Sequence, residues 1–288
     1  MVPTRKNVTK LTGAERRRFV DAVLALKRKG RYDEFVRVHI DYYVSDGDHR
    51  RRVAHMAPSF LPWHRKFLLE FEHALQQEAP GVTVPYWDWT AARSPVAPPW
   101  TDDLLGGTGR GRDRRVDTGP FARANGWVVR ANVTDDDFLV RDLGRPADPF
   151  ALPSEAELDA AMRESTYDEE PWDSTVTSGF RNGLEGWTGS RFGNDRWRNH
   201  NRVHRWVGGT MLGGASVNDP VFWLHHSFVD LLWSRWRRAH PEGAYQPAEP
   251  PGFGSLQRGR IVARGEPMPP WNVTPASMEG HGRLYRYA

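Results

Sequence analysis

The segment 218–236, NDPVFWLHHSFVDLLWSRW, most constrains what this chain can fold into. Its apolar residues recur at helical spacing on two adjacent stripes, which predicts a core helix over about 218–238. Asp219 is the expected N-cap and Pro220 the first helical residue, because proline lacks only a donor that is unpaired there anyway. Two adjacent histidines lie at the centre of this helix. A buried imidazole must hydrogen-bond or bind a metal, since leaving it unpaired costs about 1–3 kcal/mol.

Apolar periodicity and capping signals predict most of the remaining structure. Further helices are expected over about 13–29, 31–44, 62–78, 154–165 and 195–207. Residues 82–89 predict a short strand and a turn, and the Gly- and Pro-rich segment 91–153 predicts long loops with a few short strands. The expected fold is mainly α, a single domain over 1–288 with 240–288 as a wrapping C-terminal tail. In it, a central four-helix bundle is formed by 31–44, 62–78, 195–207 and 218–238.

The composition excludes several classes of site and partner. The chain contains no cysteine, so thiolate metal sites and a cysteine nucleophile are excluded. Its 40 basic and 36 acidic residues are interspersed, which indicates a mixed solvated surface and not a nucleic-acid-binding stripe. No run approaches the roughly 18 apolar residues of a membrane span. The N-terminal residues lack the pattern of a signal peptide, so we expect a cytoplasmic protein unless a partner exports it.

The positions of the histidines indicate a metal site. Of the eleven histidines, five lie on the apolar stripes of four predicted helices, and a sixth precedes the helix at 62–78 in a compact loop. The five are His39, His64, His200, His204 and His226, and the sixth is His55. Each one alone is more simply read as a hydrogen-bonded core histidine. Five together, with one pair at i, i+4 on a single helix face, favour metal binding, because neutral imidazole is a common ligand for copper and zinc.

The surrounding residues favour copper over zinc and iron. Asn201 stands in HNRVH where the HExxH motif of zinc peptidases needs glutamate. A di-iron bundle needs paired Glu-x-x-His motifs, but Glu70-Phe71-Glu72-His73 occurs once and His73 faces away from His64. Six inward imidazoles without carboxylates suit two redox-active ions, which favours dicopper and leaves a zinc or di-iron hydrolase as the chemical rival. The remaining histidines, His49, His240 and His281, are expected at the surface.

These motifs resemble a known family. The stretch HMAPSFLPWHR, the pair HNRVH with NDPVFWLHH, and the segment PYWDW are similar to the type-3 copper oxidases, namely the tyrosinases and the o-aminophenol oxidases of filamentous bacteria. The resemblance runs over nearly the whole chain. It implies two copper ions, with dioxygen as co-substrate. It also implies the ligands, with His39, His55 and His64 on the first copper and His200, His204 and His226 on the second.

Three further residues are expected around the metals, the first from the resemblance and the other two from their positions beside the ligands. His225 matches a non-ligand histidine and is expected to lie buried beside the ligands. Asp230 is expected either to orient a ligand ring or to form a salt bridge with Arg235 or Arg237. Arg205 either binds a substrate carboxylate or is a surface arginine.

One departure from the family bears on the substrate. Tyrosinases pair a glutamate in an LEGW-like segment with an asparagine to hold a water that deprotonates monophenols, and Glu185 and Asn201 match them. The intervening segment is longer here, so we expect the pair to be moved apart. The preferred hypothesis is therefore an oxidase of o-aminophenols and o-diphenols in aromatic secondary metabolism, which yields quinone imines and quinones. The alternative is a melanin-forming tyrosinase.

A dioxygen carrier of the haemocyanin kind uses the same centre. Carriers cover the metals with a further domain, and the 48 residues after His240 are too few and too Pro-rich to form one. We therefore expect an enzyme with a small phenolic or aminophenolic substrate. The resemblance further implies a small copper-delivering helper protein as partner.

Overall fold

The computed structural model describes residues 2–145, 147, 150–189 and 196–288, and this part of the chain is mainly helical. Its α-helices are α1 Gly13–Arg28, α2 Arg31–Tyr42, α3 Phe60–Glu78, α4 Glu155–Met162, α5 Phe180–Glu185, α6 Asn199–Val207, α7 Val221–Ala239 and α8 Pro275–Met278. Two short strands, β1 Thr4–Arg5 and β2 Arg286–Tyr287, form a parallel pair from the two ends of the chain. The short 3₁₀ helices are η1 Val8–Lys10, η2 Arg123–Asn125, η4 Gly209–Met211 and η5 Gly214–Asn218.

The predicted fold class is confirmed: the chain forms a mainly helical single domain with few short strands. The capping box at Thr12 and Glu15 is present at the start of α1. By contrast, no strand forms over 82–89, where Tyr86 makes only an isolated bridge to Asn7. The proline within that segment lacks a donor, which limits regular pairing.

Several helix boundaries differ from the sequence prediction, and the short helices α5 and α8 were not predicted. Helix α7 begins at Val221 and not near 218, because the preceding residues form the 3₁₀ helix η5. Asp219 nevertheless caps α7, since its Oδ1 accepts the N–H of Val221 at 3.1 Å. Helix α6 begins at Asn199, and the predicted start at 195 lies outside the described residues. The six-residue helix α5 was not predicted at all.

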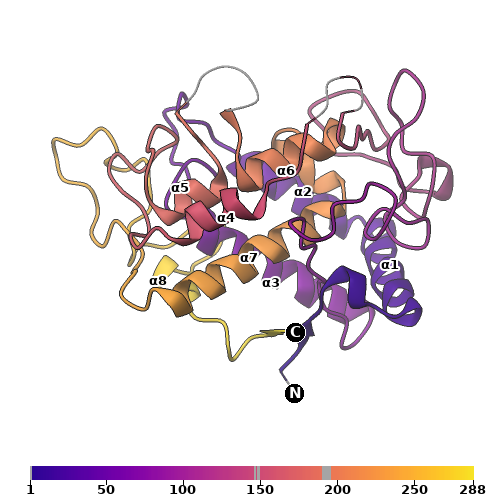
Figure 1. Cartoon of the computed structure of the whole chain (residues 1–288), viewed down its shortest axis with the longest axis horizontal. Coiled ribbons are helices and arrows are strands. Elements are labelled where there is room, and N and C mark those ends of the chain that lie inside the picture. The colour runs from indigo at the N-terminus through magenta and orange to yellow at the C-terminus, as the bar shows by residue number, and fades with distance from the viewer. Residues whose placement is uncertain (1, 146, 148–149, 190–195) are drawn as a thin grey trace.

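Helix α7 crosses the centre of the molecule with α3 beside it (Figure 1). Nearly every residue of α7 is buried, as its two apolar stripes require. The rings of Phe71 and Trp223 stack between the two helices, with centroids 3.7 Å apart and planes 2° from parallel. Such a pair adds about 0.5–1.5 kcal/mol beyond the area it buries. Helices α3 and α7 therefore form the rigid frame on which the histidines are mounted.

The two ends of the chain are anchored on this frame through Asp230, whose carboxylate is buried. It pairs with Arg65 of α3 and Arg5 of β1 and accepts hydrogen bonds from Tyr285 and Tyr287 near the C-terminus. The expectation that Asp230 orients a ligand ring, or pairs with Arg235 or Arg237, is therefore corrected. The physical reason is that α3 and both chain ends bring buried donors to it, whereas the arginine at 235 is exposed on the surface.

The long loops between α3 and α4 are fastened to the start of α7 by a buried arginine. The guanidinium of Arg141 donates to both carboxylate oxygens of Asp219, at 2.6 and 2.7 Å, and neither side chain is exposed. Its remaining donors reach backbone carbonyls at Leu105, Gly106 and Gly107. In the described part of the chain, no helix combines the length and apolar character that crossing a bilayer requires.

Candidate metal centre

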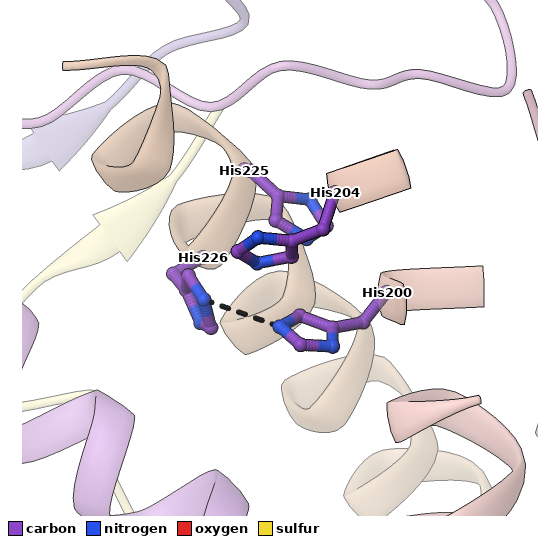
Figure 2. Close-up of side chains that lie close together, drawn as sticks. All are labelled: His200, His204, His225 and His226. Atoms are coloured by element: carbon purple, nitrogen blue, oxygen red, sulfur yellow. Dashed lines mark hydrogen bonds between the residues drawn. The ribbon is translucent and has the colours of Figure 1, made fainter. Parts of the chain in front are cut away.

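The structure brings the six predicted histidines together as two groups in the core. His39 from α2, His64 from α3 and His55 from the loop before α3 form one group. The second group consists of His200 and His204 from α6 and His225 and His226 from α7 (Figure 2). Within each group, one nitrogen per ring lies within 4.8 Å of those of the other members. The i, i+4 spacing on α6 places both its rings on the face that meets α7.

Hydrogen bonds at Nδ1 fix the orientation of four of these rings. His39 Nδ1 donates to the carbonyl of Gly214 at 2.6 Å, His64 Nδ1 to that of Phe60 at 2.8 Å, and His204 Nδ1 to that of Met211 at 2.7 Å; His200 Nδ1 donates to Asn201 Oδ1 at 3.0 Å. A carbonyl oxygen only accepts, so each Nδ1 carries the proton and each Nε2 of a neutral ring presents a lone pair. This is the arrangement that metal-ligating histidines adopt.

The lone pairs converge. The Nε2 atoms of His39 and His55 are 3.0 Å apart, and those of His200 and His226 are 3.3 Å apart. With metal–nitrogen bonds of about 2.0–2.1 Å, two ligands on one tetrahedral ion lie about 3.3 Å apart. The Nε2 atoms of His64 and His204 are buried and have no hydrogen-bond partner among the described residues. Nitrogen lone pairs this close together repel one another, and a cation between the rings relieves the repulsion. The residues present therefore fit two copper ions.

The imidazoles are held in the neutral form that binds metal. Burial lowers the pKa of His204 to about 4. Burial first, and the neighbouring histidines second, also lower the pKa values of His39, His64, His200 and His226 well below 6.5.

His225 is the member of the second group that was expected to lie buried beside the ligands without binding metal. Its ring stacks on that of His200, with centroids 5.0 Å apart and planes 17° from parallel. Neither of its ring nitrogens makes a hydrogen bond to a described residue, although the carbonyl of His200 lies near enough to raise its pKa slightly against the larger effect of burial. Its stack therefore supports the plane of the His200 ring from behind.

Backbone strain occurs beside the histidines. Met56, directly after His55, has φ 51°, and Asn199, directly before His200, has φ 37°. Left-handed conformations are uncommon for residues other than glycine and cost about 1–3 kcal/mol each, so they persist only where the surroundings impose them. Here the surroundings impose them through two hydrogen bonds. The Met56 N–H donates to the Glu185 carboxylate, and the Asn199 side-chain amide donates to the carbonyl of Gly183.

Glu185 is fully buried against the first group. Its Oε1 accepts the N–H of Met56 at 2.7 Å and lies 3.7 Å from His55 Nδ1, while Oε2 accepts from Arg181 at 3.0 Å. Burial raises the pKa of Glu185, but the neighbouring His55 and the charge of Arg181 outweigh it and lower this pKa below its usual value. The side chain is therefore an ionised carboxylate that holds the His55 ring in place.

The longer segment after LEGW does not separate Glu185 from α6. The N–H of Arg198 donates to the carbonyl of Gly186 at 3.0 Å, and Trp187 and Trp197 form a bridge at the base of the loop. A Cβ at Gly186 would lie 1.9 Å from the carbonyl oxygen of Arg198, so only glycine permits this approach. The expected separation is corrected, because the described residues on either side of the longer segment pair with each other at its base.

As a result, the backbone carbonyl of Glu185 and the side chain of Asn201 lie at the same ring, that of His200. His200 Nδ1 lies 3.0 Å from Asn201 Oδ1 and 3.3 Å from the backbone carbonyl of Glu185. The Nδ2 atom of Asn201 is buried and makes no hydrogen bond within the described part of the chain.

A cavity of about 190 Å³ opens onto the two groups. His55, His200 and His204 lie in its wall with Asn201; the others that line it are Tyr43, Trp187, Trp197, Arg205, Met211, Leu212, Gly213 and Ser216. An apolar cavity of about 150 Å³ accommodates benzene, so this one suits a single aromatic ring. Arg205 lies over the ring of Trp197, with its guanidinium carbon 5.2 Å from the centroid, and is therefore a residue of the cavity wall.

The remaining histidines and carboxylates lie elsewhere. His49 and His73 are exposed, whereas His240 and His281 are half-buried with a ring nitrogen on a backbone carbonyl. The carboxylates of EFEH are occupied as well, since Glu72 pairs with an arginine of β1 and Glu70 with a lysine of α3. Neither histidine group includes a carboxylate among the described residues, as a di-iron site would require.

Comparison with known proteins agrees with this centre. The model of the common central domain of tyrosinase matches residues 29–239. The chain is 49% identical to a tyrosinase of Streptomyces antibioticus over 285 residues, 98% of each chain. It is 40% identical to the grixazone synthase of Streptomyces griseus, covering 100% of this chain and 99% of the relative.

Solved structures share the fold at low sequence identity. A polyphenol oxidase of Thermothelomyces thermophila superposes with a TM-score of 0.61 at 23% identity, covering 86% of this chain and 74% of that one. A functional unit of Octopus hemocyanin superposes with a TM-score of 0.60 at 20% identity, covering 99% and 68%. With the match to the central domain and the full-length relatives, these findings show that the chain belongs to the tyrosinase family of type-3 copper oxidases.

Proposed function

We propose that this enzyme acts as a tyrosinase that both hydroxylates monophenols and oxidises o-diphenols, which was the alternative in the sequence analysis. The observation that carries this proposal is that the backbone carbonyl of Glu185 and the side chain of Asn201 both lie at His200 Nδ1, despite the longer loop between them, while the Glu185 carboxylate lies 3.7 Å from His55. The identities of 46–49% to several Streptomyces tyrosinases support it further.

We assign the ligands from the two histidine groups and from the family resemblance. His39, His55 and His64 would hold one copper, and His200, His204 and His226 the other. His225 is left out because its place behind the His200 ring serves as a support for that ring. Bound copper would supply the two-electron redox chemistry with dioxygen that these side chains lack.

The chain's own residues bind the substrate and remove its proton. The cavity accepts one aromatic ring and leads its phenolic oxygen toward the two histidine groups. The Glu185 carboxylate is ionised, and Asn201 Nδ2 is unpaired in the described structure. We assign to this pair the positioning of a water that accepts the phenolic proton, because a carboxylate with a lowered pKa stays available as the final acceptor near neutral pH.

A second candidate is the oxidation of o-aminophenols, the preferred hypothesis from the sequence. It is supported by the full-length similarity to a grixazone synthase, but at 40% identity this relative is more distant than the tyrosinases. Both candidates use the same cavity and the same metals. They differ in whether a monophenol is a substrate.

Oxygen uptake by the copper-loaded enzyme separates the candidates. We would compare 4-methylphenol, 4-methylcatechol and 2-amino-4-methylphenol, which share one ring and differ only in the ortho position. Uptake with all three is expected. Uptake with the catechol and the aminophenol but not with the monophenol would refute the tyrosinase proposal, and uptake with none would refute both.

We also propose that copper delivery uses a small helper protein, as the family resemblance implies. The burial of the ligand nitrogens supports this, since His64 and His226 are 3% and 1% exposed. Mixing the metal-free protein with a cuprous chelate should then give much slower loading than co-expression with a helper. Rapid loading to two ions per chain by the chelate alone would contradict this.

A further inference from the structure

Tyr43 stands in the cavity wall without a role in the chemistry described so far. It follows α2 directly, four residues after His39. Its ring contacts the ring of His55 with centroids 4.8 Å apart and that of His39 with centroids 5.9 Å apart. It lines the cavity together with Asn201 and Ser216. Tyr43 is therefore the wall of the cavity on the side of the first histidine group.

The ring of Tyr43 is held in one place. A Cβ on Gly214 would lie 3.2 Å from the Cβ and 3.5 Å from the Cγ of Tyr43, so the backbone of η5 packs closely against this side chain. The same glycine accepts the hydrogen bond from His39 Nδ1 at 2.6 Å. The backbone of one residue, Gly214, thus sets the position of both the His39 ring and the Tyr43 ring.

Tyr43 lines the cavity and is only half-buried. No hydrogen bond joins its hydroxyl to any described residue, yet this hydroxyl is not among the fully enclosed unpaired polar atoms of the described chain. By contrast, the hydroxyls of the fully buried Tyr32 and Tyr167 donate to backbone carbonyls at 2.7 and 2.6 Å. A half-buried phenol that faces a ring-sized cavity is available to hydrogen-bond whatever ring the cavity receives.

We propose that the Tyr43 hydroxyl is a specificity group that hydrogen-bonds the ortho heteroatom of the substrate. The phenolic oxygen of a bound ring would point toward the histidine groups. The ortho substituent beside that oxygen would then lie against the part of the cavity wall that is next to the histidine rings. Tyr43 packs against His55 and so provides the polar group on that wall. A phenol both donates and accepts, and it pairs with an o-hydroxyl or an o-amino group, whereas a monophenol offers only hydrogen there.

This inference deepens the proposed function and rests on it. The test is Tyr43→Phe in the copper-loaded enzyme, which removes the hydroxyl and keeps the ring. The substrates are 4-methylphenol, 4-methylcatechol and 2-amino-4-methylphenol. We expect kcat/KM to fall about 2- to 12-fold for the catechol and the aminophenol, through KM, because one neutral hydrogen bond is lost. The kcat/KM for the monophenol should not change. If the enzyme does not turn the monophenol over, the inhibition constant of the monophenol should be unchanged instead.

The neighbouring tyrosine gives a matched control. Tyr42 packs on Trp63 with centroids 6.0 Å apart and does not line the cavity, so Tyr42→Phe should leave every constant unchanged. Both variants should bind two copper ions per chain. Equal losses on all three substrates, no loss on any, or the same discrimination in Tyr42→Phe would overturn the inference. Native enzyme that takes up no oxygen would instead refute the proposed function itself.

Discussion

Replacing Arg141 with methionine should destabilise the enzyme strongly without touching the site. Arg141 makes a two-pronged, fully buried pair with Asp219, which caps the helix that carries His226. Methionine retains most of the apolar stem but leaves the Asp219 carboxylate buried without its counter-charge. Breaking a buried pair in this way costs about 3–5 kcal/mol, because the remaining ion is desolvated and unpaired.

The magnitude converts into a temperature. Unfolding entropy is about 2.1 cal/mol/K per residue, which gives about 0.6 kcal/mol/K for 288 residues. A loss of 3–5 kcal/mol therefore lowers Tm by about 5–8 °C. The matched control is Arg123→Met in the same loop region, where the pair with Asp137 is 43% and 50% exposed. Such a pair contributes about 0–1 kcal/mol, so its Tm should fall by less than about 2 °C.

Differential scanning calorimetry on copper-loaded protein of equal metal content measures both effects. Asp219→Asn provides a further check, because it removes the buried charge that Arg141 balances. In a chain that already carries Asp219→Asn, Arg141→Met should lower Tm clearly less than it does in the native chain. The reasoning is that the unpaired Asp219 carboxylate causes the loss of stability. A fall in Tm of under 2 °C for Arg141→Met, or an equal fall in the native and the Asp219→Asn chains, would refute it.

Three further substitutions test the site. His226→Ala should lower bound copper below two per chain and abolish oxygen uptake, whereas exposed His73→Ala should change neither; metal analysis beside the oxygen electrode decides this. Glu185→Gln should reduce monophenol hydroxylation at least tenfold more than o-diphenol oxidation, because the amide is no proton acceptor, and equal losses would remove its proposed role. Arg205→Ala should raise KM about tenfold for a carboxylated catechol and leave that of 4-methylcatechol unchanged, since one charge-assisted hydrogen bond is lost.

The histidine-bearing helices were predictable because their signals are local. An apolar residue every three or four positions marks the buried face of a helix, and histidines on that face must point inward. This reasoning places His39, His64 and the pair His200 and His204 without any knowledge of the tertiary fold. It also explains the exposure of His73, which is on the opposite face of α3 from His64.

Features that depend on distant residues were not predictable. Asp230 has Arg235 and Arg237 near it in sequence, but its partners Arg5 and Arg65 are 225 and 165 positions away. Helix α5 was missed because FRNGLE is only six residues long, too short to show an apolar period, and contains a helix-disfavouring glycine.

The position of Glu185 shows why segment length misled the prediction that this residue is moved away from α6. Extra residues separate two groups only if the chain between them is open. Here Gly186 and Arg198 close the loop with one backbone hydrogen bond, so its length has no effect on the distance across its base. Lengthening a loop also changes the free energy of folding little, since doubling the length of a flexible loop costs only about 0.6 kcal/mol. The length of a loop therefore carries little information about a site at its base.

The orientation of the ligand rings was the least predictable feature, and it is the one on which metal binding depends. Helical spacing brings an imidazole to the core but leaves its rotation free. The rotation is set by carbonyl acceptors, and two of them, Met211 and Gly214, lie in the 3₁₀ helices between α6 and α7. Because these acceptors are backbone atoms, no side-chain replacement removes them directly. The η4 and η5 turns thus preorganise His204 of one group and His39 of the other, so that one short segment aligns lone pairs in both halves of the centre.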